Sequence, residues 1–181
     1  VLSKLYSKVL LRLAQYGKDL SVQVQFAFEQ GHQAHEVVYI LRTAIEKWEE
    51  WRERPLLVLE GDLYKAYDST THTQVVRGLR RKGIEDVLIA AWLREVVGST
   101  TEFAADPHTK SGPVSRSQSL FQGDPSAPRL FNMALDEPAS LFLDKCRKEN
   151  WGVRLREYAG YVLDWDEEPI LSLLLFADNY W

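Results

Sequence analysis

Apolar residues recur every three or four positions in several parts of the chain, which is the spacing of one face of an α-helix. This spacing predicts a first helix over residues 2–15, which Gly17 would end. A second helix is expected over residues 35–54, between Gly31 and Pro55. The N-terminal third of the chain is therefore expected to be mainly helical.

Three further helices are predicted in the middle of the chain. The first begins at the side-chain oxygens of Asp68, Ser69 and Thr70, which are typical N-cap residues. The second covers about residues 85–97, and the third opens at Pro128, because proline suits the first turn of a helix. These helices would account for most of residues 68–149.

Short apolar runs bounded by turn residues predict strands. The two clearest runs are residues 55–63, which contain Asp62 near their end, and residues 169–176, which lead into Asp178. Weaker candidates are a strand over residues 151–155 and a hairpin over residues 100–114. A few short strands among several helices predict an α+β fold.

The predicted core joins the two main strands to two of the helices. It comprises Leu57, Val58, Leu59, Leu88, Ala91, Leu130, Phe131, Leu173, Leu174 and Phe176.

Composition narrows the class of protein. The 181 residues suit a single domain, and 45% hydrophobic with 27% charged residues exclude a disordered chain. A single cysteine, Cys146, excludes a disulfide framework and a cysteine-based zinc site. The apolar runs are too short to cross a bilayer and no signal peptide opens the chain, so we expect a soluble protein of undetermined compartment.

Three segments carry the candidate chemistry. They read GDLYKAYDS at 61–69, SLFQGDPSAPRLFNMALD at 119–136 and LLLFADN at 173–179. In order and content they resemble motifs A, B and C of reverse transcriptases, in particular those of non-LTR retrotransposons and group II introns. Residues 25–46 are similar to the fingers segment of the same family. The resemblance implies a partial reverse-transcriptase domain over residues 1–181, with the thumb absent.

The same resemblance divides the chain into two parts. About residues 1–54 would be fingers-side helices, and about residues 55–181 would be the palm with its antiparallel sheet. The chain ends three residues beyond Asp178, so the return strand of the motif C hairpin is expected to be missing. An unpaired last strand would leave its backbone donors and acceptors exposed unless another chain covered it.

Two aspartates are the candidate catalytic residues. Nucleotidyl transfer develops charge on the attacking and leaving oxygens, which two Mg²⁺ or Mn²⁺ ions can stabilise. Hard cations bind carboxylate oxygens, and Asp62 and Asp178 would converge at the ends of neighbouring strands. The resemblance adds the carbonyl of Leu63 and the side chain of Asn179 as further metal ligands. A single aspartate at a strand end is usually a solvated turn or cap residue, so the metal site depends on the coincidence of all three motifs.

Three other residues are expected to face the nucleotide. By resemblance, Tyr67 is a steric gate whose ring would collide with a ribose 2′-hydroxyl, and Gln122 would hydrogen-bond near the templating base or sugar. Gly123 would allow the backbone to approach the nucleotide closely. On its residues alone, Tyr67 is equally well explained as a core residue beside a helix start.

Several features depart from the family pattern. Asn179 stands where motif C usually has a second aspartate, and His32 where the fingers segment commonly has arginine. The net charge is −4, whereas nucleic-acid enzymes usually have a basic surface. The compact basic run is Arg77, Arg80, Arg81 and Lys82, which suits a solvated helix end as well as a phosphate track.

Two functions follow from these observations. The first is template-directed nucleotidyl transfer in a complete protein that binds a nucleic-acid template–primer and a dNTP; this chain alone is expected to be inactive. The alternative is a decayed or domesticated reverse-transcriptase fragment that serves as a structural or interaction subunit of a larger assembly. In that case other protein chains would cover the C-terminal strand.

Overall fold

The computed structural model describes residues 2–22, 24–51, 56–104, 106, 109–115, 118–154 and 170–181. The chain folds into two compact units, each built from two separate segments. Unit 1 comprises Val1–Leu20 and Tyr64–Glu137, and unit 2 comprises Ser21–Leu63 and Pro138–Trp181. Helices and small antiparallel sheets are mixed along the chain, which confirms the predicted α+β fold. The expected division into fingers-side and palm parts stays a prediction.

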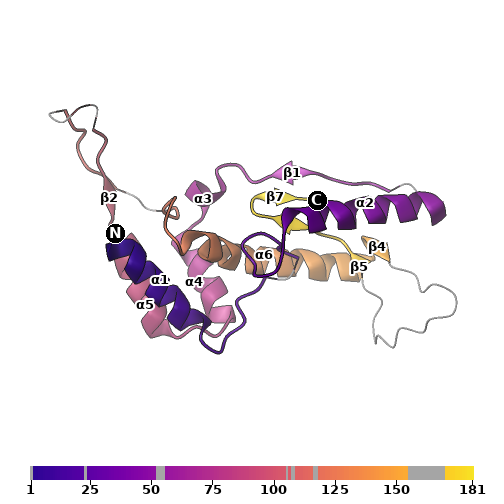
Figure 1. Cartoon of the computed structure of the whole chain (residues 1–181), viewed down its shortest axis with the longest axis horizontal. Helices are drawn as coiled ribbons and strands as arrows, with labels where there is room; N and C mark the ends of the chain where they lie inside the picture. The colour runs from indigo at the N-terminus through magenta and orange to yellow at the C-terminus, as the bar shows by residue number, and fades with distance from the viewer. Residues whose placement is uncertain are drawn as a thin grey trace. The chain divides into compact units, whose positions relative to one another are not determined.

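Unit 1 is mainly helical. Its elements are α1 (Leu2–Gln15), α3 (Ala66–Ser69), α4 (His72–Arg81), α5 (Asp86–Val96) and the first part of α6 (Ala127–Glu149). Helix α1 packs along α5, and α4 contacts α5 (Figure 1). The predicted bounds of α1 are confirmed, because its apolar spacing is a local property of the chain.

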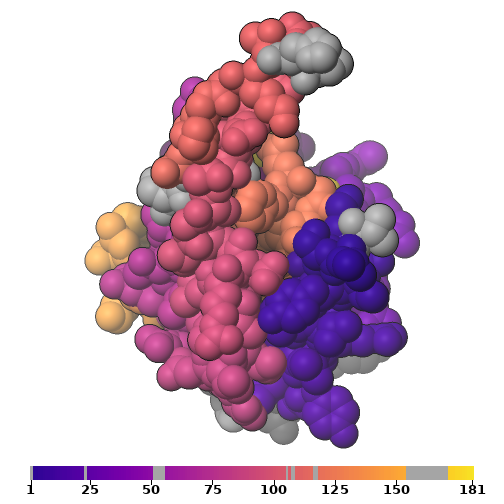
Figure 2. Space-filling view, turned by 90° about the vertical axis from the view of Figure 1, so that its left-hand side faces the viewer, coloured from indigo at the N-terminus to yellow at the C-terminus, as the bar shows by residue number. Residues whose placement is uncertain are grey.

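A hairpin arm leaves the helices of unit 1. Strands β2 (Thr100–Thr101) and β3 (Val114–Ser115) pair antiparallel, which confirms the predicted hairpin. Figure 2 shows this arm projecting beyond α1 and α5 of the same unit.

The start of α4 differs from the prediction. Its N-cap is Thr71, whose hydroxyl accepts a hydrogen bond from the backbone N–H of Gln74, while the Gln74 side chain accepts one from the Thr71 backbone. This is a capping box, which satisfies two of the backbone donors at a helix start. Asp68 and Ser69 instead belong to the short α3, and Thr70 is its C-cap, so none of them caps α4.

The core of unit 1 gathers around the first part of α6. Phe131 and Met133 are fully buried, and Leu130 is 6% exposed, which confirms the predicted burial of Leu130 and Phe131. Helix α5 turns Ile89 and Trp92 inward, whereas Leu88 and Ala91 are only half-buried. The prediction for α5 was therefore displaced by one position on the helix, which rotates the buried face by about 100°.

Unit 2 holds a three-stranded sheet. Strands β1 (Gly61–Asp62), β7 (Asn179–Tyr180) and β6 (Leu175–Phe176) form an antiparallel sheet in the order β1-β7-β6. Helix α2 (Ala34–Trp51) runs alongside β6 (Figure 1). A second small sheet pairs β4 (Val153–Arg154) with β5 (Ile170–Leu171).

The expectation that the return strand would be missing was wrong. Strand β7 is that return strand, and it pairs with β6 on one side and with β1 on the other. The free side of β6 is occupied as well, because Leu175 donates its N–H to Val24 and accepts one from Phe26. Asn179 and Tyr180, the two residues after the turn, are enough to form the ladder with β6. The backbone of β6 at Leu175 therefore finds its partners within this chain.

The buried strand expected over residues 55–63 is much shorter in the structure. Only Gly61–Asp62 is a strand, whereas Leu57 is 92% and Leu59 is 71% exposed. A two-residue pairing with β7 reaches only the end of the apolar run, so the preceding leucines gain no neighbours from it. Leu174 is buried as predicted, while Leu173 and Phe176 are half-buried. The predicted strands begin or end at three residues that lie outside the described residues: Pro55, Leu155 and Pro169.

The helices of the described ranges do not meet the requirements of a membrane-spanning helix. No helix there has both the length and the apolar character needed to cross a bilayer.

Candidate metal site and nucleotide-side residues

The register of β1 and β7 brings the backbone at Asp62 next to the turn that contains Asp178. Asp62 lies directly opposite Asn179, and the backbone N–H of Leu63 donates to the carbonyl of Asp178 at 2.9 Å. Hydrogen-bonded and non-hydrogen-bonded pairs alternate along an antiparallel ladder, so Asp62 and Asn179 form a non-hydrogen-bonded pair. Side chains in such a pair lie on one face at close range. The backbone of the two segments is therefore adjacent, and the convergence of the Asp62 and Asp178 carboxylates on one cation stays a prediction.

Asp178 occupies the tight turn between β6 and β7. Phe176 pairs with Asn179, so Ala177 and Asp178 are the two central residues of the turn. Ala177 has a φ of +56°, and Asp178 has no positive φ. This pattern is that of a type II′ turn, whose first central position favours glycine. The residue beside the candidate metal ligand is therefore held in a conformation that costs alanine free energy.

The donor atoms around this turn suit a hard cation. Asp62 is exposed, while Asp178 and Asn179 are half-buried, and together they offer two carboxylates and one amide oxygen. Within the described part of the chain, no group of three or more His, Cys, Asp or Glu side chains is arranged to hold a metal ion. Mg²⁺ is commonly held by only one or two carboxylates, with water and substrate phosphates as its other ligands. The oxygen donors are of the kind that Mg²⁺ accepts, and a metal ion at this turn stays a prediction.

Tyr67 lies in unit 1, where two contacts hold it. Its ring stacks on that of Phe131, with centroids 5.1 Å apart and planes 18° apart, and its carbonyl accepts the N–H of Leu120 at 3.0 Å. Ser119 also donates its N–H to Thr70, three residues after Tyr67. These bonds join residues 67–70 to residues 119 and 120. The half-buried ring agrees with either explanation of Tyr67, as a gate or as a packing residue.

The loop at residues 121–126 is built around an aspartate that the sequence patterns did not single out. Asp124 accepts hydrogen bonds from the hydroxyl of Ser7 at 2.8 Å and from the N–H of Ser126 at 2.7 Å. The Asp-x-Ser spacing is a common turn pattern and could have revealed this role. Gly123 has a φ of +82°, so it meets a conformational need whether or not a nucleotide approaches.

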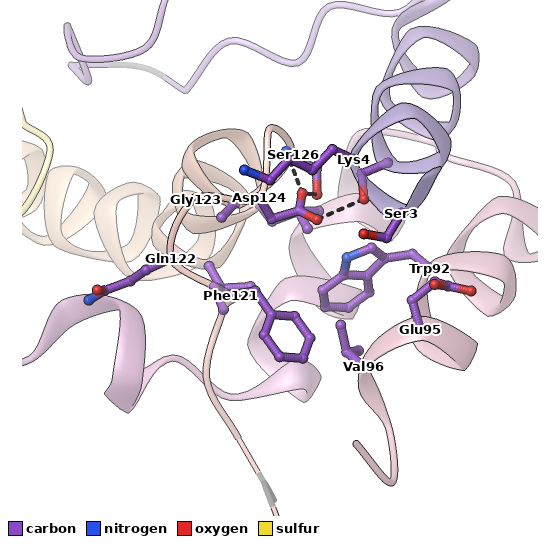
Figure 3. Close-up of a pocket in the computed structure, with 14 residues that line it drawn as sticks. Ser3, Lys4, Trp92, Glu95, Val96, Phe121, Gln122, Gly123, Asp124 and Ser126 are labelled. Carbon is purple, nitrogen blue, oxygen red and sulfur yellow. Dashed lines mark hydrogen bonds between the residues drawn. The ribbon is translucent and has the colours of Figure 1, made fainter. Parts of the chain in front are cut away.

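A pocket of about 320 Å³ lies beside this loop. Figure 3 shows the residues that line it. Lys4 of α1, Trp92 and Glu95 of α5, and Phe121 line it together with neighbouring residues. The amide group of Gln122 extends away from Phe121 and Trp92, and the side chain is exposed (Figure 3). Gln122 is thus available to a ligand on the outer side of the loop.

The basic run at the end of α4 is engaged in ion pairs. Arg81 and Lys82 lie 3.0 and 3.1 Å from the carboxylate of Asp136, whose side chain is only 8% exposed. Arg80 pairs with Asp86 at 2.8 Å, and Arg77 lies 3.9 Å from Glu137. These carboxylates compete with any phosphate for the same cations. The geometry favours a structural helix end over a phosphate track.

His32 lies at the surface beside the start of α2. Its Nδ1 is 2.8 Å from a carboxylate oxygen of Glu36, and the other oxygen of Glu36 accepts the N–H of Gln33 at 3.0 Å. The hydrogen bond with His32 lowers the pKa of Glu36, and the Gln33 bond acts in the same direction. His32, which precedes α2, therefore interacts with the first turn of that helix.

Replacing His32 by alanine is expected to raise the pKa of Glu36 toward its ordinary value of 4.5. A carboxyl with a lowered pKa in the folded state stabilises the fold above its unfolded pKa and loses that effect as the pH falls through the folded pKa. The variant should therefore lose a small stabilisation above about pH 4.5. An NMR titration of the Glu36 carboxyl measures the shift. His35→Ala is the control, because His35 acts only as a weaker charge; an equal shift in both variants would contradict this assignment.

Comparison with known proteins bears on the origin of the chain. No family model matches it. Two proteins described as the Retrovirus-related Pol polyprotein from type-1 retrotransposable element R2, both of Popillia japonica, are 32% and 31% identical to it over 80 residues. The matched segment is 44% of this chain but only 11% and 13% of those polyproteins. The similarity supports a reverse-transcriptase-related origin of the non-LTR retrotransposon type.

Proposed function

We propose that this chain is the fingers and palm part of a reverse-transcriptase-like protein whose complete form carries out template-directed nucleotidyl transfer. The observation that supports it best is the β1–β7 register, which sets Asp62 beside the Asp178–Asn179 turn. The partial similarity to R2 Pol polyproteins points in the same direction. The substrates of the complete protein would be a nucleic-acid template–primer and a dNTP.

In this proposal unit 2 supplies the metal ligands. Asp62 and Asp178 provide the two carboxylates, and the Asn179 amide and the Leu63 carbonyl add neutral oxygen donors. A bound Mg²⁺ or Mn²⁺ would stabilise the charge that develops on the attacking and leaving oxygens. The short ladder of β1, β7 and β6 holds these donors on rigid backbone, which limits how far they can separate.

The resemblance also gives this proposal its nucleotide-facing residues. The Tyr67 ring, backed by Phe131, would exclude a 2′-hydroxyl, because a stacked ring cannot easily turn aside. The exposed Gln122 amide offers both a donor and an acceptor to a base or sugar. Gly123 presents backbone with no side chain in the way.

Localised Mn²⁺ binding tests the proposal. In an NMR titration of the whole chain, paramagnetic Mn²⁺ should broaden the amide signals of residues 61–63 and 177–180 before those of unit 1. Excess Mg²⁺ should restore the signals by competition. Broadening that begins elsewhere, or no selective broadening at all, would contradict the metal site. Primer extension by an R2 Pol polyprotein that carries this chain in place of its own matching segment would then test nucleotidyl transfer.

A second function is favoured by one observation, the amide of Asn179 directly opposite Asp62. A domesticated subunit would keep the fold, whereas its metal site could weaken. An uncharged amide in place of a carboxylate is such a weakening. The two functions differ in the extension assay: activity of the natural sequence supports the polymerase, whereas activity that appears only after Asn179→Asp supports the decayed site.

The substitution Asn179→Asp is expected to raise Mn²⁺ affinity about tenfold, because affinity for hard cations rises with the number of charged ligands. The titration described above measures the change. Gln30→Glu is the control, since it makes the same amide-to-carboxylate change at an exposed position of unit 2. Equal effects of the two substitutions would mean that overall charge, and not a local site, governs binding.

A further inference from the structure

The buried side chain of Gln25 is hydrogen-bonded to the turn that carries Asp178. Its side-chain oxygen accepts the N–H of Ala177 at 3.0 Å, and its side-chain NH₂ donates to the Ala177 carbonyl at 3.2 Å. Both backbone polar groups of Ala177 are therefore bound by one amide. The two residues are 152 positions apart in the chain, and Gln25 is only 4% exposed.

The glutamine is itself fixed in place. Its side-chain oxygen also accepts the N–H of Ala27 at 3.0 Å. The backbone on either side is bonded to β6, since Leu175 donates to Val24 and Phe26 donates to Leu175. The amide of Gln25 thus has little freedom to turn, and its pairing with Ala177 is determined by the β6 ladder.

The turn needs such support because of the residue at its first central position. Ala177 has a φ of +56°, which is unfavourable for any residue with a Cβ and would relax if the backbone were free. Relaxation of Ala177 would move Asp178, the next residue, away from β1. Because the Gln25 side chain is hydrogen-bonded to both the N–H and the carbonyl of Ala177, it opposes that movement.

We propose that Gln25 is a positioning residue that holds the Ala177–Asp178 turn in the conformation needed to bind a divalent cation. Gln25 does not touch the cation in this scheme, and it acts only through the backbone of Ala177. The inference rests on the proposed function, because it presupposes that Asp178 is a metal ligand. It adds a residue of the N-terminal part of the chain to the requirements of that site.

Three variants of the whole chain test the inference, with Mn²⁺ broadening of the amide signals of residues 177–180 as the readout. Gln25→Ala is expected to weaken Mn²⁺ binding at least about tenfold, the usual effect of removing a partner that orients a metal ligand. Gln25→Met should act in the same way, since it fills the space without hydrogen bonds. Gln33→Ala, an exposed glutamine of the same unit, is the control and should bind as the natural protein does.

The double variant Gln25→Ala with Ala177→Gly separates positioning from general stability. Glycine adopts positive φ without steric cost, so the turn should keep its conformation without the hydrogen bonds of Gln25. Most of the lost Mn²⁺ affinity should then return. No such rescue is expected if Gln25 merely stabilises unit 2. A failure of rescue, in a variant that remains folded, would therefore overturn the inference.

Hydrogen exchange gives a second readout that needs no metal. Because Gln25 accepts the Ala177 N–H, this amide should exchange about tenfold faster in Gln25→Met than in the natural protein. Unchanged exchange and unchanged Mn²⁺ affinity would overturn the inference and leave the proposed function standing. Absence of Mn²⁺ binding by the natural protein would instead overturn the proposed function itself.

Discussion

Replacing Asp62 by alanine is expected to lower Mn²⁺ affinity at the Asp178 turn by at least about a hundredfold. Loss of an outer-shell partner already costs up to about that factor, and Asp62 would be a direct ligand. The substitution removes one of only two carboxylates, so the remaining Asp178 would compete poorly with water. The Mn²⁺ titration measures the loss of affinity. Primer extension by the R2 Pol polyprotein that carries this chain should fall as well.

The fold should survive this substitution, because the Asp62 side chain is exposed. Asp144→Ala is the matched control: it removes another carboxylate from unit 2, one that forms a surface ion pair with Arg147 at 2.9 Å. Such pairs contribute little to stability. If both variants bound Mn²⁺ equally well, Asp62 would not be a ligand and the two-carboxylate site would be wrong.

Replacing Gly78 by alanine is expected to destabilise unit 1 by about 3 kcal/mol or more, a loss of over a hundredfold in the folded-to-unfolded ratio. Gly78 is buried in α4, and a Cβ there would lie 2.6 Å from the carbonyl carbon of Met133 and closer still to its oxygen. Both atoms are backbone of α6, so no side chain can move aside. The two helices would have to separate, which would also pull Arg81 and Lys82 away from Asp136.

Urea unfolding followed by circular dichroism measures this loss. Gly112→Ala is the control, because an added Cβ meets nothing within 4 Å and Gly112 has no positive φ. That variant should be neutral or slightly stabilised, since alanine restricts the unfolded chain. Equal stability of the two variants would show that α4 and α6 tolerate a wider spacing than the structure indicates.

Local features were predictable to different degrees. The bounds of α1 followed from apolar spacing, because helix formation depends on neighbours three and four residues away. The capping box of Thr71 and Gln74 was also a local signal and was overlooked in favour of Asp68, Ser69 and Thr70. The motif resemblance placed Asp62 and Asp178 at the ends of neighbouring strands, and in the structure Asp62 pairs with Asn179, the residue after Asp178.

Features that join distant residues were not predictable in this way. The exposure of Leu57 and Leu59 depends on how far β1 pairs with β7, and apolar content carries no such information. The pairing of Asp136 with Arg81 and Lys82 depends on the close packing of α4 and α6 at Gly78.

The sequence by itself determined the helices, the α+β class and the order of the three chemical segments, because periodicity, turn residues and short motifs act over a few positions. Only the tertiary structure decided which backbone lies against which. It supplied the pairing of β1 with β7, the ion pairs of the buried Asp136 and the hydrogen bonds between Gln25 and Ala177. Each of these contacts depends on hydrogen bonds or packing between residues far apart in the chain, and such partners leave no spacing that a linear pattern could reveal.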